Sequence, residues 1–218
     1  MMDAIKSTLW TWCDLDSDEF VSIQISRKII SAEENSRSER FRFDIHKNRY
    51  IRCRAYLRLI LCELTGEAPE NLTIDLGENE KPYLKGNPVY FNLSRSGRYA
   101  AYAFNYESPV GIDVEFIKPS FDFLNVTETV FSKNEIKLLR YKSRTEQQKA
   151  FYQFWTAKEA YLKLLGTGLM IEPIHVSLNF EFGIPVSCSL KHYPDSSLTY
   201  IKLPINDLIC CLSTPVTT

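Results

Sequence analysis

The sequence predicts an α+β protein of two similar-sized lobes, each an antiparallel sheet with packed helices. Two segments with apolar residues at helical spacing, 44–64 and 144–165, lie far apart in the chain, and strand-rich regions follow both. Residues 72–116 read as several short strands separated by Gly, Pro and Asn turns. A doubly wound parallel sheet is excluded because it needs helices between those strands.

The boundary between the lobes is predicted near "NYESP" at residues 105–109. We therefore expect an N-terminal lobe at 1–105 and a C-terminal lobe at 106–218. A chain of 218 residues is long enough to bury a sizeable core in this arrangement. No convincing residue-level repeat relates the two halves.

The N-terminal lobe opens with a predicted strand at 9–15, "LWTWCDL". Ser31 with Glu34 three residues later has the pattern of a capping box, which marks a helix start. The long helix at 44–64 then follows, and Gly66 is its expected stop.

The C-terminal lobe repeats this sequence of signals. Ser132 and Glu135 form a second capping-box pattern, and the helix at 144–165 runs up to a "GTG" turn. The last fifty residues return to strands.

Composition predicts a soluble globular protein without a global electrostatic role. The chain is 44% hydrophobic and 24% charged with a net charge of −1, so nothing favours nucleic acid or membrane as a partner. There is no signal-peptide pattern and no apolar run of about 18 residues, which predicts a cytoplasmic location. The six cysteines lack a CxxC pair and are expected to be reduced core thiols.

The segment "GIDVEF" at 111–116 places two carboxylates on one face of a predicted strand. Residues two apart in a strand share a face, so Asp113 and Glu115 project together. Like charges this close are costly unless they are solvated, protonated or neutralised by a cation. A wet strand face is the simpler alternative for this segment alone.

A second motif, "FWTAKEAYLKLLGTGL", favours neutralisation of these carboxylates by a cation. Trp155, Glu159 and Lys163 recur every four residues and lie on one helix face. An ordinary Glu159 to Lys163 surface pair would contribute only about 0.3–0.5 kcal/mol, but this helix has aromatic residues on nearly every side, so Glu159 needs a stronger partner. Three carboxylates are a suitable hard-oxygen set for Mg²⁺, and Mn²⁺ suits the same ligands.

The strongest charge asymmetry in the chain is a basic stretch between residues 37 and 58. A solvated helix face explains most of it, and nucleic-acid binding is a competing interpretation. The stretch has no interleaved aromatic stacking pattern, so we do not expect a nucleic-acid partner. Its cations are Arg37, Arg40, Arg42, Lys47, Arg49, Arg52, Arg54 and Arg58.

Together, "GIDVE", "WTAKEAYLK" and "KPY…FNLSRSG" resemble the motifs of the 4′-phosphopantetheinyl transferase superfamily, in particular its longer, surfactin-synthetase-activating (Sfp) type. The resemblance covers about residues 31–180. It implies a monomer of two pseudo-symmetric lobes with coenzyme A and Mg²⁺ in the cleft between them. The implied reaction moves the phosphopantetheine arm of coenzyme A to a serine of an apo acyl or peptidyl carrier protein and releases 3′,5′-ADP.

The resemblance also implies roles for particular residues. Glu159 and Lys163 would be catalytic, and Asp113, Glu115 and Glu159 would bind the metal. The residues implied to contact coenzyme A are Arg37, Arg49, Lys81, Pro82, Ser94, Arg95, Asp113, Lys158 and Lys163. Arg95 departs from the family pattern, which has histidine there; arginine keeps the charge but cannot change protonation near neutral pH.

Docking of the carrier protein is expected on the segment after the carboxylate strand, at Phe121, Phe123 and Leu124. Nearby lysines and arginines would complement an acidic or apolar carrier helix. The alternative is that these aromatics pack inside the lobe, which we expect for Phe131. A non-catalytic coenzyme A-binding regulator of the same fold remains the rival function.

Overall fold

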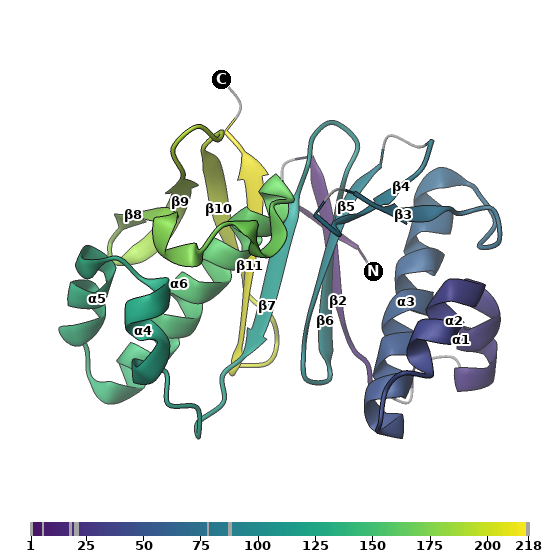
Figure 1. The fold of residues 1–218 in the computed structure, drawn as a ribbon, viewed down its shortest axis with the longest axis horizontal. Helices are drawn as coiled ribbons and strands as arrows, with labels where there is room; N and C mark the ends of the chain where they lie inside the picture. Colours follow the sequence, from purple (N-terminus) through teal and green to yellow (C-terminus); the bar gives the residue numbers. More distant parts are fainter. Residues whose placement is uncertain are drawn as a thin grey trace.

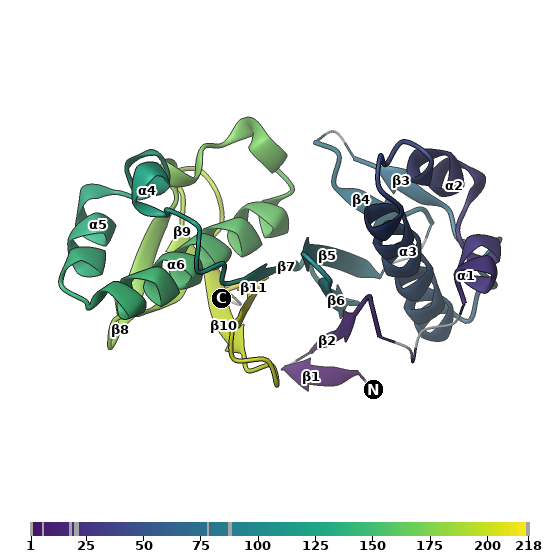
Figure 2. The same ribbon diagram turned by 90° about the horizontal axis from the view of Figure 1, so that it is seen from below.

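The computed structural model describes residues 2–5, 7–17, 19, 22–77, 79–86 and 89–216. The chain forms two lobes side by side, each with one long helix packed on an antiparallel sheet (Figure 1). The long helices are α3 (Asp44–Thr65) and α6 (Arg144–Leu165). Figure 2 shows the shorter helices outside them, α1 and α2 beside α3 and α4 and α5 beside α6. The predicted α+β class is confirmed.

The N-terminal lobe contains a four-stranded sheet in the order β1-β2-β6-β5 and a separate hairpin of β3 and β4. All of its strand pairs are antiparallel. Its remaining elements are β1 (Asp3–Ile5), β2 (Thr8–Asp14), α1 (Ile23–Ile29), α2 (Ala32–Ser38), β3 (Ile74–Leu76), β4 (Pro82–Leu84), β5 (Tyr90–Ser96) and β6 (Tyr99–Asn105).

The predicted helix signals of this lobe are confirmed. Ser31 caps α2, and its hydroxyl and the Glu34 carboxylate form the expected reciprocal capping box. Helix α3 ends at Gly66, which adopts a left-handed backbone (φ 75°) and donates its N–H to the Cys62 carbonyl.

The C-terminal lobe contains a five-stranded antiparallel sheet in the order β7-β11-β10-β9-β8. The predicted helix starting beside Ser132 and the long helix are both confirmed, each with a capping box. Its remaining elements are β7 (Gly111–Phe116), α4 (Leu124–Val130), α5 (Lys133–Arg140), the 3₁₀ turns η1 (Gly168–Met170) and η2 (Pro173–His175), β8 (Ser177–Glu181), β9 (Ile184–Ser189), β10 (Ser196–Ile201) and β11 (Leu208–Pro215).

The strands in 72–116 belong to three sheets, which the sequence did not predict. After β6 the Asn105 side chain accepts the N–H groups of Glu107 and Ser108, so the chain turns away from the first sheet. It then enters β7, which pairs with β11 at the other end of the sequence. The lobe boundary at residues 105 and 106 stays a prediction, and the change of sheet occurs in this turn.

The two sheets share an apolar core, and their edge strands β5 and β7 face each other. Small residues of β6, Ala101 and Ala103, pack in one buried cluster with Val110, Ile112 and Val114 from the start of the second sheet. These edge strands belong to different sheets, and a side chain connects them: Asn92 of β5 accepts the Ile112 N–H of β7 at 2.9 Å. The contact between β5 and β7 therefore fixes the position of everything they carry.

All six cysteines are free thiols, but the expectation of core thiols holds for four of them, because Cys13 and Cys62 are only partly buried. Among the described residues, no helix is both long and apolar enough to cross a membrane.

Candidate active site

The two acids of β7 face β5 across the lobe boundary. Asp113 is buried and accepts the Ser94 hydroxyl at 2.7 Å, and Glu115 accepts the Ser96 hydroxyl at 2.7 Å. The Ser96 oxygen also accepts the Phe116 N–H at 3.0 Å. Alternate residues of β5 therefore hold alternate residues of β7, as the period of two in a strand requires.

Gly111, the first residue of "GIDVEF", lets helix α6 lie directly on β7. A Cβ atom at this position would lie 2.0 Å from the Ala160 carbonyl oxygen and 2.5 Å from the Leu164 amide nitrogen, closer than any side-chain atom can approach. The helix backbone occupies that space instead. This close packing brings the Lys163 ammonium to Asp113, to which it donates, and to the Ser94 hydroxyl at 2.9 Å.

The site concentrates negative charge around one lysine. Burial, and next the charge of Asp113, raise the pKa of Glu159 to about 7, while Lys163 opposes the shift. Burial and Asp113 also raise the pKa of Glu115, although the Ser96 hydroxyl and the Trp155 side chain favour its charged form. Asp113, Glu115 and Glu159 are thus close enough to influence one another's pKa, and Lys163 alone does not neutralise them; their shared role at a metal stays a prediction.

The residues present fit a hard divalent cation such as Mg²⁺. The Asp113 Oδ2 atom is buried without a hydrogen-bond partner, and a buried carboxylate oxygen left unpaired is costly. The carboxylates around it supply the oxygen donors that Mg²⁺ prefers. Across the described part of the chain, however, no group of three or more His, Cys, Asp or Glu side chains is placed to hold a metal ion. Joint ligation by all three acids therefore remains a prediction.

A largely apolar cavity of about 340 Å³ opens beside Glu115. The sequence analysis had named Phe121 and Trp155, which line this cavity, but it had not predicted the cavity itself. The signal that could have found it is the aromatic face of α6 one turn before Glu159. Its other lining residues are Lys118, Val126, Thr129, Val130, Phe151 and Tyr152.

A second cavity of about 480 Å³ lies where the β3–β4 hairpin meets the C-terminal end of α6. Lys81 and Pro82 line it, together with Tyr83 and Gly166. The Lys81 ammonium donates to two backbone carbonyls of the C-terminal lobe. The structure therefore places Lys81 and Pro82, both implied to contact coenzyme A, at the lobe boundary but outside the carboxylate cluster of Asp113, Glu115 and Glu159.

Three predicted nucleotide contacts also lie outside that cluster. Arg95 alternates with Ser94 and Ser96 along β5, so it points to the opposite face, where its guanidinium lies 5.8 Å from the centre of the Tyr50 ring. Arg49 forms an ion pair with Asp16. Arg37 lines a separate cavity of about 420 Å³ with Arg40 and Glu80. Contact of these arginines with coenzyme A stays a prediction.

The prediction that Lys158 contacts coenzyme A is wrong. Its side chain is fully buried inside the C-terminal lobe, and its ammonium donates to the Glu135 carboxylate at 2.8 Å and to the Val130 and Pro173 carbonyls at 3.0 Å. Successive helix residues point about 100° apart, so Lys158 and Glu159 cannot face the same site.

The docking segment is partly corrected as well. Phe123 is only 1% exposed and packs against the Phe151 ring, so it belongs to the core and cannot dock a carrier protein as predicted. Phe121 and Leu124 are 39% and 50% exposed. Phe131 is buried, as expected.

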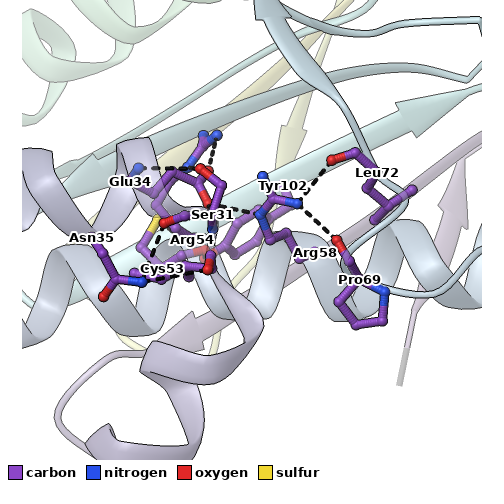
Figure 3. Close-up of polar contacts among 10 residues, drawn as sticks. Ser31, Glu34, Asn35, Cys53, Arg54, Arg58, Pro69, Leu72 and Tyr102 are labelled. Atoms are coloured by element: carbon purple, nitrogen blue, oxygen red, sulfur yellow. Dashed lines mark hydrogen bonds and ion pairs between the residues drawn. The ribbon is translucent and has the colours of Figure 1, made fainter.

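Part of the basic stretch 37–58 is internal to the N-terminal lobe. Figure 3 shows the Glu34 carboxylate accepting from Arg54 at 2.6 Å and from Arg58 at 2.7 Å. Arg58 also donates to the Pro69 and Leu72 carbonyls. Arg54 and Arg58 therefore hold α2 against α3, and Arg58 also holds the loop that follows α3, so these two side chains do not form a surface for phosphate groups.

The fold and the site together define a class of protein. Two α+β lobes meet at a strand with two acids and a helix with a third acid and a lysine, an arrangement suited to binding a cation and phosphate groups at a lobe boundary.

The comparisons agree with this class. The family model of the 4′-phosphopantetheinyl transferase superfamily matches residues 109–213, which include both motifs of the carboxylate site. The chain is thus similar to the 4′-phosphopantetheinyl transferase superfamily over slightly less than half of its length.

Several curated proteins are similar to this chain. It is 36% identical over 154 residues to the 4′-phosphopantetheinyl transferase HetI of Nostoc sp., covering 68% of this chain and 65% of HetI. It is 34% identical to psf-1 of Bacillus pumilus over 71% of this chain and 65% of that protein. It is 28% identical to Sfp of Bacillus subtilis over 85% of this chain and 83% of that protein. The aligned chain thus spans slightly less than two thirds of HetI and psf-1.

A solved structure, the holo-[acyl-carrier-protein] synthase of Thermotoga maritima, matches 48% of this chain and 61% of that chain at 22% identity and a TM-score of 0.38.

Proposed function

We propose that this protein is a 4′-phosphopantetheinyl transferase that moves the phosphopantetheine arm of coenzyme A onto a serine of an apo acyl or peptidyl carrier protein. The observation that carries the proposal is the carboxylate site at the lobe boundary, with its buried, unpaired Asp113 oxygen and the Lys163 ammonium beside it. The match to the superfamily model over residues 109–213 and the names of the similar proteins support the same reaction.

The reaction forms one bond and breaks one. The serine oxygen of the carrier attacks the β-phosphorus of coenzyme A, the bond from this phosphorus to the bridging oxygen breaks, and 3′,5′-ADP leaves with that oxygen. The serine proton must be accepted. Glu159 suits this role because it is a carboxylate of the same site, near Asp113 and Lys163.

Charge neutralisation is the second requirement of phosphoryl transfer. Lys163 is placed to bind pyrophosphate oxygens, since its ammonium already lies among acceptor oxygens of Asp113 and Ser94. Asp113, Glu115 and Glu159 would hold Mg²⁺, which when bound supplies further positive charge beside the pyrophosphate. The proposed enzyme is a monomer.

The two cavities suit the two ends of coenzyme A. The cavity beside Glu115 is apolar, fits a narrow flexible chain such as the pantetheine arm, and lies next to the reacting phosphorus in this proposal. The cavity at Pro82 and Tyr83 suits the nucleotide end. The carrier would dock at the exposed Phe121 and Leu124, which follow the acids of β7 in the chain.

A transfer assay with labelled coenzyme A and an apo carrier protein tests the proposal. We expect label to reach the carrier serine with wild-type protein. We also expect Asp113→Ala and Glu159→Ala to abolish transfer and leave the fold intact, because removing one acid relieves repulsion within the site. Near-normal turnover of either variant at saturating Mg²⁺ would refute the assignment. Binding of coenzyme A without transfer to any carrier type would support a non-catalytic regulator instead.

A further inference from the structure

The GTG turn after α6 packs against the segment that leads into β4, and the carboxylate site does not account for this contact. Gly166 and Gly168 both have left-handed backbones, with φ of 69° and 55°. A Cβ atom on Gly166 would lie 3.1 Å from the Lys81 Cδ atom, and one on Gly168 would lie 3.2 Å from the Asn79 carbonyl oxygen. Glycine therefore permits both the turn and the close approach of the two lobes.

Lys81 connects the lobes at the same place. Its ammonium donates to the Val110 carbonyl at 3.2 Å and to the Leu164 carbonyl at 3.1 Å. Val110 immediately precedes β7, and Leu164 lies in the last turn of α6, where carbonyls have no partner within the helix and attract positive charge. One lysine of the N-terminal lobe thus binds both elements that carry the carboxylate site.

We propose that Lys81 is a positioning residue that latches the two lobes together, in place of the coenzyme A contact implied by the resemblance. The latch consists of Asn79 and Lys81 on one lobe and Gly166 and Gly168 on the other. The latch itself does not depend on the proposed function. Only its expected effect on the rate of transfer rests on that function. Lys163 reaches Ser94 across the same lobe boundary, so its alignment depends on how the lobes are held.

The competing role is direct contact with a ligand, because Lys81 also lines the 480 Å³ cavity. Two variants separate the roles. Lys81→Met removes the ammonium and keeps most of the side chain. Gly168→Ala changes no charge and lies outside the residues that line the cavity, but it pushes against the Asn79 carbonyl oxygen. Only the latch predicts that both variants behave alike.

The matched control is Lys85→Met. Lys85 follows β4 in the same hairpin, is exposed, and lies 3.7 Å from Asp75 of the same lobe. This variant loses the same charge without touching the C-terminal lobe, so it reports the effect of a lost lysine alone.

Hydrogen exchange of the ligand-free protein is the first measurement. For Lys81→Met and Gly168→Ala we expect amides at 109–111 and 164–168 to exchange about tenfold faster than in wild type and Lys85→Met, since local opening exposes these hydrogen bonds. The double variant should exchange no faster than the single variants, because both changes break one coupled unit. Unchanged exchange in both single variants overturns the latch.

Steady-state kinetics are the second measurement. A latch predicts a fall in kcat of about tenfold with the KM for coenzyme A changed less than threefold, since misalignment by a fraction of an ångström affects the chemical step. A tenfold rise in that KM for Lys81→Met, with Gly168→Ala like wild type, assigns Lys81 to the ligand and overturns the proposal. If wild type shows no transfer at all, the proposed function fails, while the exchange measurement still decides the latch.

Discussion

Gly111→Ala should separate activity from stability, because it acts on the distance between β7 and α6. The added Cβ would lie 2.0 Å from the Ala160 carbonyl oxygen, whereas ordinary contact begins at 3.4 Å, so the helix must move by about 1.4 Å. Overpacking of this kind costs about 1–3 kcal/mol of folding free energy. A displacement of about 1 Å at a reacting group can cost about 100-fold in rate.

We therefore expect kcat/KM for carrier modification to fall by about 100-fold and the melting temperature by about 3–10 °C. The assay follows label from coenzyme A to the carrier, beside thermal unfolding of the same samples. Gly66→Ala is the matched control, since Gly66 has a φ of 75° and nothing within 4 Å of an added Cβ. Its backbone strain should cost about 1 kcal/mol with normal turnover. Gly111→Ala with turnover within twofold of wild type would refute the packing argument.

Three further predictions concern other parts of the molecule. Ser96→Ala should lower activity by about 10-fold, because Glu115 loses the hydroxyl that orients it; an unchanged kcat/KM would contradict this. Leu124→Ala should raise the KM for the carrier several-fold and leave that for coenzyme A unchanged, whereas the buried Phe123→Ala should cost about 3–5 kcal/mol of stability in urea unfolding. Glu34→Gln should lower the free energy of unfolding by about 3 kcal/mol at pH 7. Burial opposes ionisation of Glu34, but Arg54, the Ser31 N–H and Arg58 lower its pKa overall, so its charge stabilises the fold above the unfolded pKa. The difference in stability between Glu34→Gln and wild type should therefore shrink as the pH falls below about 4.

The helices and strands of this protein could be predicted because their signals are local. The capping boxes at Ser31 and Ser132 and the stop at Gly66 depend on residues within one turn of each other. The partition of strands into three sheets could not be predicted, because β7 pairs with β11 almost a hundred residues later. Contacts of that range leave no periodic pattern in a single sequence.

The sequence predicted correctly those site residues whose side-chain direction follows from their spacing. It failed for residues whose access to the site depends on burial. The period of two places Asp113 and Glu115 together, and the spacing of four places Lys163 beside Glu159. Lys158 was assigned to the site because it adjoins Glu159 in sequence, and Phe123 was assigned to carrier docking because its segment follows the acid strand. Both are buried, and only tertiary packing determines that: Lys158 bonds to residues at α4 and α5, and Phe123 packs on Phe151 of α6.

The spacing of the two motifs also has a physical reading beyond the charges they carry. Asp113 can meet Lys163 only if a helix backbone comes close to a strand backbone, and at that crossing any residue larger than glycine collides with Ala160 and Leu164. Gly111 and the Lys163 turn of α6 are therefore one geometric unit although some fifty residues separate them. The same turn ends in Leu164, whose carbonyl binds Lys81 of the other lobe, so a shift of α6 on β7 would also strain the contact between the lobes. Gly111→Ala should consequently increase hydrogen exchange at the GTG turn as well as lower the rate.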